Sequence, residues 1–167
     1  MSQQRIYTGS SGQMLVMAEL LFRQCNAAVP EVDTGTDVFA FHNDRPEVAR
    51  IQVKTGQGKR YKKEPGYRAA FDIPMQQLRQ RDDPRLFYAL VARVEGQWED
   101  VIVIGRRDLC GFWESPLNFG TMNSASGNLV LTVQYRLTQV ICSEVDLTPF
   151  RNAWETLPPL APESNLP

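Results

Sequence analysis

Four polar side chains that can do chemistry lie on two short, neighbouring stretches of the sequence. Asp33 and Asp37 belong to "VDTGTDVFAF", and Gln52 and Lys54 belong to "VARIQVKT". Both stretches are otherwise rich in apolar and β-branched residues, which predicts two strands. A charged or amide side chain in such a sheet is costly to bury unless it is paired or bound to a ligand. The question is therefore whether these side chains form one site.

The turn between the two predicted strands decides which side chains meet. The connecting "HNDRPE" contains Asn43, Asp44 and Pro46, which favour turns. With a turn of two or four residues, Asp37 lies opposite Gln52, and Lys54 points to the same side of the sheet as Gln52. A turn of three or five residues would shift the register by one and separate them.

A carboxylate, an amide and an ammonium at one point are suited to chemistry on a phosphate. Asp37, the amide oxygen of Gln52 and the backbone carbonyl of Val53 are the oxygen ligands that a hard cation such as Mg²⁺ or Mn²⁺ prefers. Lys54 beside that metal would orient a water molecule or stabilise negative charge on a phosphate. We therefore predict Asp37, Gln52 and Lys54 as catalytic residues.

The rest of the chain predicts elements that could hold this hairpin. Residues 10–24 contain "MLVMAELLF", which is apolar nearly all round and predicts a helix buried against a sheet. Residues 56–68 predict a loop. The order of elements is helix, strands, helix, strands, helix, which indicates an α/β fold with a mixed central β-sheet flanked by helices. The further predicted elements are helices over 71–81 and 147–157, a short helix in "RDLCGFW" and strands in "RLFYALVARV", "QWEDVIVIGR" and "NLVLTVQYRL".

Length and composition set limits on the architecture and on the function. The 167 residues suit a single domain over 1–157, followed by a Pro-rich flexible tail over 158–167. The net charge of -1 does not by itself indicate nucleic-acid binding. Three distant cysteines and one histidine argue against a zinc site and favour a reducing, cytoplasmic location. No apolar run is long enough to cross a membrane.

A local basic segment follows the second predicted strand. From Lys54 to Arg68 there are six basic residues and one acid, with Tyr61 and Tyr67 among them. Such a loop beside the hairpin site could neutralise backbone phosphates of a nucleic acid. The predicted nucleic-acid-binding residues are Lys59, Arg60, Lys62, Lys63 and Arg68.

These motifs together resemble the PD-(D/E)XK nuclease superfamily, which has a restriction endonuclease-like fold. The resemblance covers residues 9–58, with a helix that starts "GQMLVMAELL", then "DTGTD", a turn and "IQVKT". It is closest to the D…QxK variant of Mrr-type enzymes and small stand-alone bacterial members. It implies a Mg²⁺- or Mn²⁺-dependent endonuclease that hydrolyses phosphodiester bonds in DNA. Where many members have a glutamate on the first helix, this chain has Gln13, and Glu19 is the remaining acidic candidate for the metal.

The sequence leaves two alternative functions open and predicts a homodimer. Gln13 and Gln52 stand where many members of the superfamily have acids. These amides suit a catalytically inactive module of nuclease fold that binds nucleic acid or a partner protein. "DTGTD" also resembles the "DTGAD" of retroviral-type aspartic proteases, which would use Asp33 in a dimer. Against the protease, Glu31 stands where that fold has an apolar strand, and the protease has no use for "IQVKT". We expect a homodimer, because cutting both strands of a duplex requires two sites.

Overall fold

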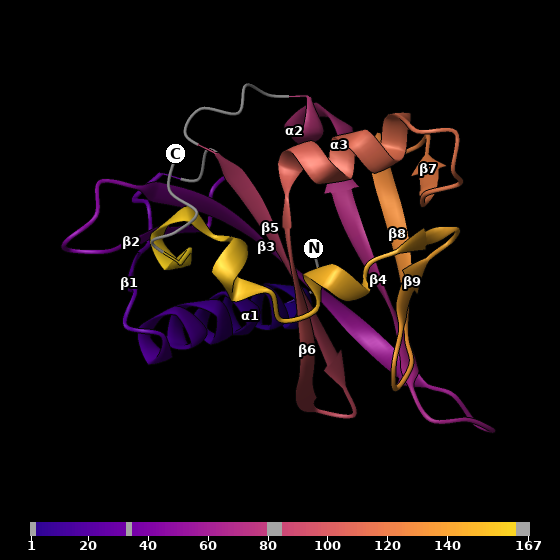
Figure 1. Cartoon of the computed structure of the whole chain (residues 1–167). Coiled ribbons are helices and arrows are strands. Elements are labelled where there is room, and N and C mark those ends of the chain that lie inside the picture. Colours follow the sequence, from indigo (N-terminus) through magenta and orange to yellow (C-terminus); the bar gives the residue numbers. More distant parts are fainter. Residues whose placement is uncertain (1–2, 33–34, 80–84, 163–167) are drawn as a thin grey trace.

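A long central strand and the sheet that branches from it organise the chain (Figure 1). The computed structural model describes residues 3–32, 35–79 and 85–162. The helices in that part of the chain are α1 (Gln3–Phe22), α2 (Met75–Leu78) and α3 (Arg106–Glu114), and the 3₁₀ turns are η1 (Thr148–Phe150), η2 (Trp154–Thr156) and η3 (Pro158–Leu160). The strands are β1 (Asn26–Ala28), β2 (Val38–Phe41), β3 (Val48–Arg60), β4 (Tyr67–Pro74), β5 (Leu86–Val94), β6 (Gln97–Gly105), β7 (Thr121–Asn123), β8 (Asn128–Tyr135), β9 (Val140–Cys142) and β10 (Val145–Asp146).

The strand β3 has different neighbours along its two edges. One edge pairs in parallel with β5 over residues 50–58. The other edge pairs with β2 over residues 48–51 and with β4 over residues 58–60, both antiparallel. Among the described residues, positions 52–57 therefore have a strand partner on the β5 edge only. This open edge between β2 and β4 leaves room for side chains to approach the backbone of β3.

Two apolar clusters occupy the two faces of the sheet, as the alternating pattern of β3 requires. Ile51 and Val53 belong to a cluster that also contains Val16 and Leu20 of α1. The other face packs β4 and β8 against β5 and β6, with Phe71 and Leu131 among its buried residues. Gln52 and Lys54 alternate with Ile51 and Val53, so they lie on this second face, close to where β4 leaves β3.

The helix α1 packs on the first face through a close contact that requires glycine. A Cβ atom added at Gly12 would lie 2.0 Å from Oγ1 of Thr55 on β3. The expected packing of this helix against the sheet is present, and it covers one side of the helix. Within residues 6–22, every exposed position of α1 is uncharged: Ile6, Tyr7, Gly9, Ser10, Met14, Ala18, Leu21 and Phe22.

Several predicted elements differ from the structure. The helix expected over 71–81 is strand β4 as far as Pro74 and then the four-residue α2, because residues 67–74 alternate between buried and exposed in register with β8. The expected loop over 56–68 is mostly strand, since β3 continues to Arg60. Residues 147–157 form 3₁₀ turns in place of a helix.

The C-terminal segment packs against the sheet further along the chain than predicted. Residues 158–160, expected in the tail, form η3, in which Pro159 is buried and Leu160 packs on the α1 cluster. Arg45 donates a hydrogen bond of 2.6 Å to the carbonyl of Ala161. The turns η1 to η3 lead the chain back across the sheet towards β2 (Figure 1). In the described part of the chain, no helix combines the length and the apolar character that crossing a membrane would need.

Candidate functional site

The hairpin of β2 and β3 has the predicted register, although its connection spans residues 42–47 and is longer than the two or four residues expected. Val38 pairs with Ile51 and Phe41 pairs with Val48, so the next position along places Asp37 opposite Gln52. The backbone N–H of Asp37 donates to the carbonyl of Ile51 at 2.9 Å, which is one residue out of the regular ladder and marks where the pairing of β2 with β3 ends. The expectation that Asp37 and Gln52 meet is confirmed, because one side-chain oxygen of Asp37 accepts a hydrogen bond from Nε2 of Gln52.

Asp37 sits against the open edge of β3. The same oxygen, Oδ2, accepts a hydrogen bond of 2.7 Å from the backbone N–H of Val53. In a strand, the N–H and C=O of one residue point to the same edge, so the Val53 carbonyl also faces this gap between β2 and β4. The carboxylate and a backbone carbonyl are thus on the same edge, as metal binding would require.

A chain of two amides connects Asp37 to the loop before β2. Nε2 of Gln77 donates to the carbonyl of Gly35 at 2.9 Å and to Oε1 of Gln52 at 2.6 Å. Gln52 in turn donates to Asp37. The two ends of this chain can only accept, since one is a backbone carbonyl and the other a carboxylate. The orientation of both amides follows from these ends: Gln77 must present N–H to Gly35, and Gln52 must present N–H to Asp37.

The hydrogen-bonded chain of Gln77 and Gln52, called the amide relay below, is buried, so each of its hydrogen bonds is costly to lose. Gln52 and Gln77 are both 7% exposed. Gly35 has a φ of 90° and fits closely against the relay, because a Cβ there would lie 2.8 Å from Nε2 of Gln77. Gln77 therefore occupies the space that the missing side chain of Gly35 leaves. Oε1 of Gln77 is buried and has no hydrogen-bond partner among the described residues.

The helix α1 contributes a third amide to the same group. Nε2 of Gln13 donates a hydrogen bond of 2.7 Å to the backbone carbonyl of Asp37. Gln13 therefore lies beside Asp37, at the position where the sequence resemblance implies a glutamate. The close contact between Gly12 and Thr55 holds this turn of the helix on β3.

The remaining predicted residues of the site have different positions. Lys54 follows Gln52 on the same side of β3 and is half-buried. Glu19 lies nearly two turns from Gln13 and forms an ion pair of 2.5 Å with Arg23, so its role as a metal ligand stays a prediction. Arg23 also stacks over the ring of Trp154, so this pair belongs to the packing of α1. Asp33 lies outside the described residues.

The basic segment is not beside the site, contrary to expectation. Lys59 lies seven residues along β3 from Gln52, which corresponds to about 23 Å of extended strand. Figure 1 shows the β3–β4 hairpin reaching away from β2. Arg60 is paired with Glu95 at 3.3 Å and Glu99 at 2.6 Å, and its pKa is raised, first by the hydrogen bond with Glu99. Whether Lys59, Lys62, Lys63 and Arg68 bind nucleic acid stays a prediction.

Sequence reasoning missed Gln77 altogether. The pattern "FDIPMQQLRQR" suggested one amphipathic helix, in which Gln76 and Gln77 look alike. The structure ends β4 at Pro74, so that the short α2 turns Gln77 inward while Gln76 stays exposed. The one signal available was that Gln77 falls between the apolar Met75 and Leu78, both of which are buried.

The residues present offer a limited set of ligands for a hard cation. They supply one carboxylate, from Asp37, together with the Val53 carbonyl and the oxygen of Gln52 if that amide turns over. In the described ranges, no group of three His, Cys, Asp or Glu side chains could hold a metal ion. The oxygen donors fit Mg²⁺ or Mn²⁺ in kind, but a single carboxylate predicts weak binding.

The backbone arrangement is similar to that of a solved endonuclease. The structure of the bacterial homing endonuclease I-Ssp6803I matches with a TM-score of 0.54, covering 93% of this chain and 90% of that chain, at 17% sequence identity. No family model matches the sequence, and no curated protein does. The expected fold class, a mixed α/β fold of the nuclease type, is thereby confirmed.

Proposed function

We propose that the protein is a metal-dependent nuclease of the PD-(D/E)XK type that hydrolyses phosphodiester bonds, with DNA as substrate. The observation that carries the proposal is the contact of Asp37 with both Gln52 and the Val53 backbone at the open edge of β3. The likeness of the fold to a homing endonuclease supports the same class of function.

Asp37, the Val53 carbonyl and Gln52 would hold Mg²⁺ or Mn²⁺. When bound, the cation would lower the pKa of a water molecule and neutralise charge on the phosphate. Oδ2 of Asp37 accepts a hydrogen bond from the backbone N–H of Val53, which fixes the carboxylate against the strand. Lys54, on the same side of β3, would orient the water or stabilise the phosphate oxygens during attack.

Gln52 must change its orientation before it can offer oxygen to a cation. In the structure its N–H group faces Asp37 and its oxygen faces Gln77. If both side-chain amides rotated by half a turn, Gln52 would present Oε1 to the cation. Oε1 of Gln77, which has no hydrogen-bond partner among the described residues in the present orientation, would then accept a hydrogen bond from Gln52. The hydrogen bond from Gln77 to Gly35 would be lost in exchange. Metal binding is therefore expected to be weak and coupled to this rearrangement.

The function is tested by incubating the purified protein with supercoiled plasmid, linear duplex, single-stranded DNA and RNA, in Mg²⁺ or Mn²⁺. Asp37→Asn and Lys54→Ala are expected to lose cleavage, whereas Arg136→Ala, which removes an exposed arginine beside the distant hairpin, retains it. Equal cleavage by all four proteins would indicate a contaminating nuclease. Absence of cleavage on every substrate would refute the enzymatic proposal.

A second candidate function is a module of the same fold that binds nucleic acid or a partner protein without cleaving anything. The observation that favours it is the relay itself, in which the N–H of Gln52 already satisfies Asp37 without a cation. Mn²⁺ titration of the wild-type protein separates the two functions. Binding that disappears in Asp37→Asn supports the enzyme, and no binding at millimolar Mn²⁺ supports the module.

The proposed homodimer would form through the exposed face of α1. Tyr7, Met14 and Leu21 are spaced by seven residues, so they form a stripe along that uncharged face. The spacing is symmetric about Met14, and a two-fold interface needs such self-complementarity. Phe22, 85% exposed, extends the apolar surface. A cytoplasmic location is part of the same proposal, in keeping with three free thiols.

A further inference from the structure

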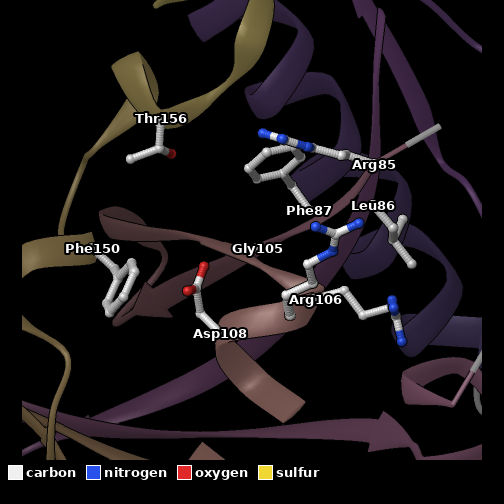
Figure 2. Close-up of a pocket in the computed structure, with 9 residues that line it drawn as sticks. Arg85, Leu86, Phe87, Gly105, Arg106, Asp108, Phe150 and Thr156 are labelled. Atoms are coloured by element: carbon white, nitrogen blue, oxygen red, sulfur yellow. The ribbon is translucent and has the colours of Figure 1, made fainter. Parts of the chain in front are cut away.

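A basic cavity opens at the end of β5 and β6, away from the β3–β4 hairpin. Its volume is about 280 Å³. Its lining includes three arginines, Arg85, Arg106 and Arg107, together with a single acid, Asp108. Figure 2 shows Arg85 and Phe87 on one wall and Asp108 and Phe150 on the opposite wall. Cationic side chains and aromatic rings around one hollow suit a ligand that carries both phosphate and an apolar group.

The cavity lies at the same end of the sheet as Asp37. Gln52 pairs with Tyr88, and Tyr88 pairs with Ile104, so these three residues form a row across β3, β5 and β6. The next pair, Phe87 with Gly105, belongs to the cavity wall. Asp37 lies opposite Gln52 on the far edge of β3, which places the cavity three strand spacings away, or about 14 Å.

The charged side chains that line the cavity favour an anionic ligand. Arg85 and Arg107 are exposed at its rim, whereas Arg106 is half-buried and donates to the carbonyl of Leu78 in α2. Asp108 folds back over Gly105 at the start of α3, where an acid interacts favourably with the helix dipole. Among the described residues that line the cavity, guanidinium groups outnumber carboxylates, which suits a phosphodiester.

We propose that this cavity binds a backbone phosphate of the nucleic acid strand that passes Asp37, an inference that rests on the proposed function. A separation of about 14 Å corresponds to roughly four steps of duplex DNA at 3.4 Å per step. The partly exposed ring of Phe150 would contact the sugar or base next to that phosphate. The cavity, and not the β3–β4 hairpin, is then the main phosphate contact near the site.

The position of α2 supports the link between the cavity and the site. Leu78, whose carbonyl Arg106 holds, is the residue after Gln77 of the relay. The sulfur of Cys110 in α3 also lies 3.2 Å from that carbonyl. The element that carries Gln77 is thus held in place by a residue that lines the cavity.

The test measures binding of labelled 20-nucleotide DNA, single-stranded and duplex, by fluorescence anisotropy in EDTA, where no cleavage can occur. Arg85→Gln is compared with Arg136→Gln, a matched loss of one exposed arginine that follows β8 and pairs with Glu64 of the distant hairpin. Loss of a phosphate contact should lower the slope of log K against log salt by about 1. We therefore expect Arg85→Gln to weaken binding about three- to ten-fold at 0.1 M salt and Arg136→Gln to leave it unchanged.

A scan with single methylphosphonates, which remove the charge of one phosphate, locates the contact on the strand. One position should weaken binding to the wild-type protein but not to Arg85→Gln. Equal effects of the two arginine variants, or no binding of either DNA form, would overturn the proposal. Inorganic phosphate or a mononucleotide that competes as well as the oligonucleotide would also overturn it, because the ligand would then be a small molecule.

This binding test is independent of hydrolysis. If Arg85→Gln lowers the salt slope while the wild-type protein cleaves nothing, the cavity proposal stands and the enzymatic one falls. If the protein cleaves DNA and Arg85→Gln binds as well as wild type, the cavity proposal falls alone.

Discussion

Replacing Gln77 by methionine should break the amide relay without leaving a hole, because the two side chains have similar length. Gln77→Met removes the hydrogen bonds of 2.9 Å to Gly35 and 2.6 Å to Gln52. Each buried acceptor left without a donor costs about 1–3 kcal/mol. The variant also removes the unpartnered Oε1 of Gln77, which offsets one of the two losses.

The net expected loss in the free energy of unfolding is therefore about 1–3 kcal/mol. For a chain of this size it corresponds to a melting temperature lower by roughly 2–12 °C. Gln76→Met is the matched control, since Gln76 is exposed on the same helix and its change should stay within about 0.5 kcal/mol. Urea unfolding and thermal melts of both variants give the comparison.

A double-mutant cycle makes the test specific to the relay. Gln52→Met and Gln77→Met each break the hydrogen bond between the two amides, so their effects should not add. A coupling energy of about 0.5–3 kcal/mol is expected for residues that share such a bond. The reasoning is refuted if the two changes are additive, or if Gln77→Met is no more destabilising than Gln76→Met.

Four further predictions concern metal binding, packing, pH and assembly. Gln52→Glu should bind Mn²⁺ more tightly than wild type in calorimetry, and melt at a lower temperature without metal, because two carboxylates then meet. Gly12→Ala should lower the free energy of unfolding by about 1–3 kcal/mol, since its Cβ would meet Thr55 at 2.0 Å, and adding Thr55→Ala should restore part of it. Burial raises the pKa of Cys142 from 9.0 to about 11, so its contribution to stability is present below pH 9 and is lost as pH rises to about 11; the pH dependence of urea unfolding should be flatter in Cys142→Ala. The proposed dimer predicts that Met14→Lys is a monomer in sedimentation velocity where wild type is a dimer, and equal masses of the two proteins would contradict the α1 interface.

The register of the β2–β3 hairpin could be predicted from the sequence because two local constraints agreed. The turn formers between the strands allowed an even number of residues, and the alternation of Ile51 and Val53 with Gln52 required one face to be apolar. A slip of one residue would have turned Ile51 away from α1. The contact between Asp37 and Gln52 follows from the same constraint.

The relay and the cavity could not be predicted because they depend on contacts between distant parts of the chain. Gln77 reaches Gln52 only because β4 pairs with β8 up to Pro74, which shortens the predicted helix to one turn. Likewise, Arg85 and Arg106 come together through the pairing of β5 with β6. Local propensity carries no information on either pairing.

The amide at position 52 has a physical consequence that an acid would not share. A glutamate there would face the carboxylate of Asp37, and the pair would be stable only with a cation or a proton between them. Gln52 instead donates to Asp37 and accepts from Gln77, so the site is complete without any cation. A metal must therefore compete with an existing hydrogen bond for Asp37. If the protein is a nuclease, cleavage should then need a higher Mg²⁺ concentration than in Gln52→Glu, and substrate phosphates that add oxygen ligands should lower that requirement.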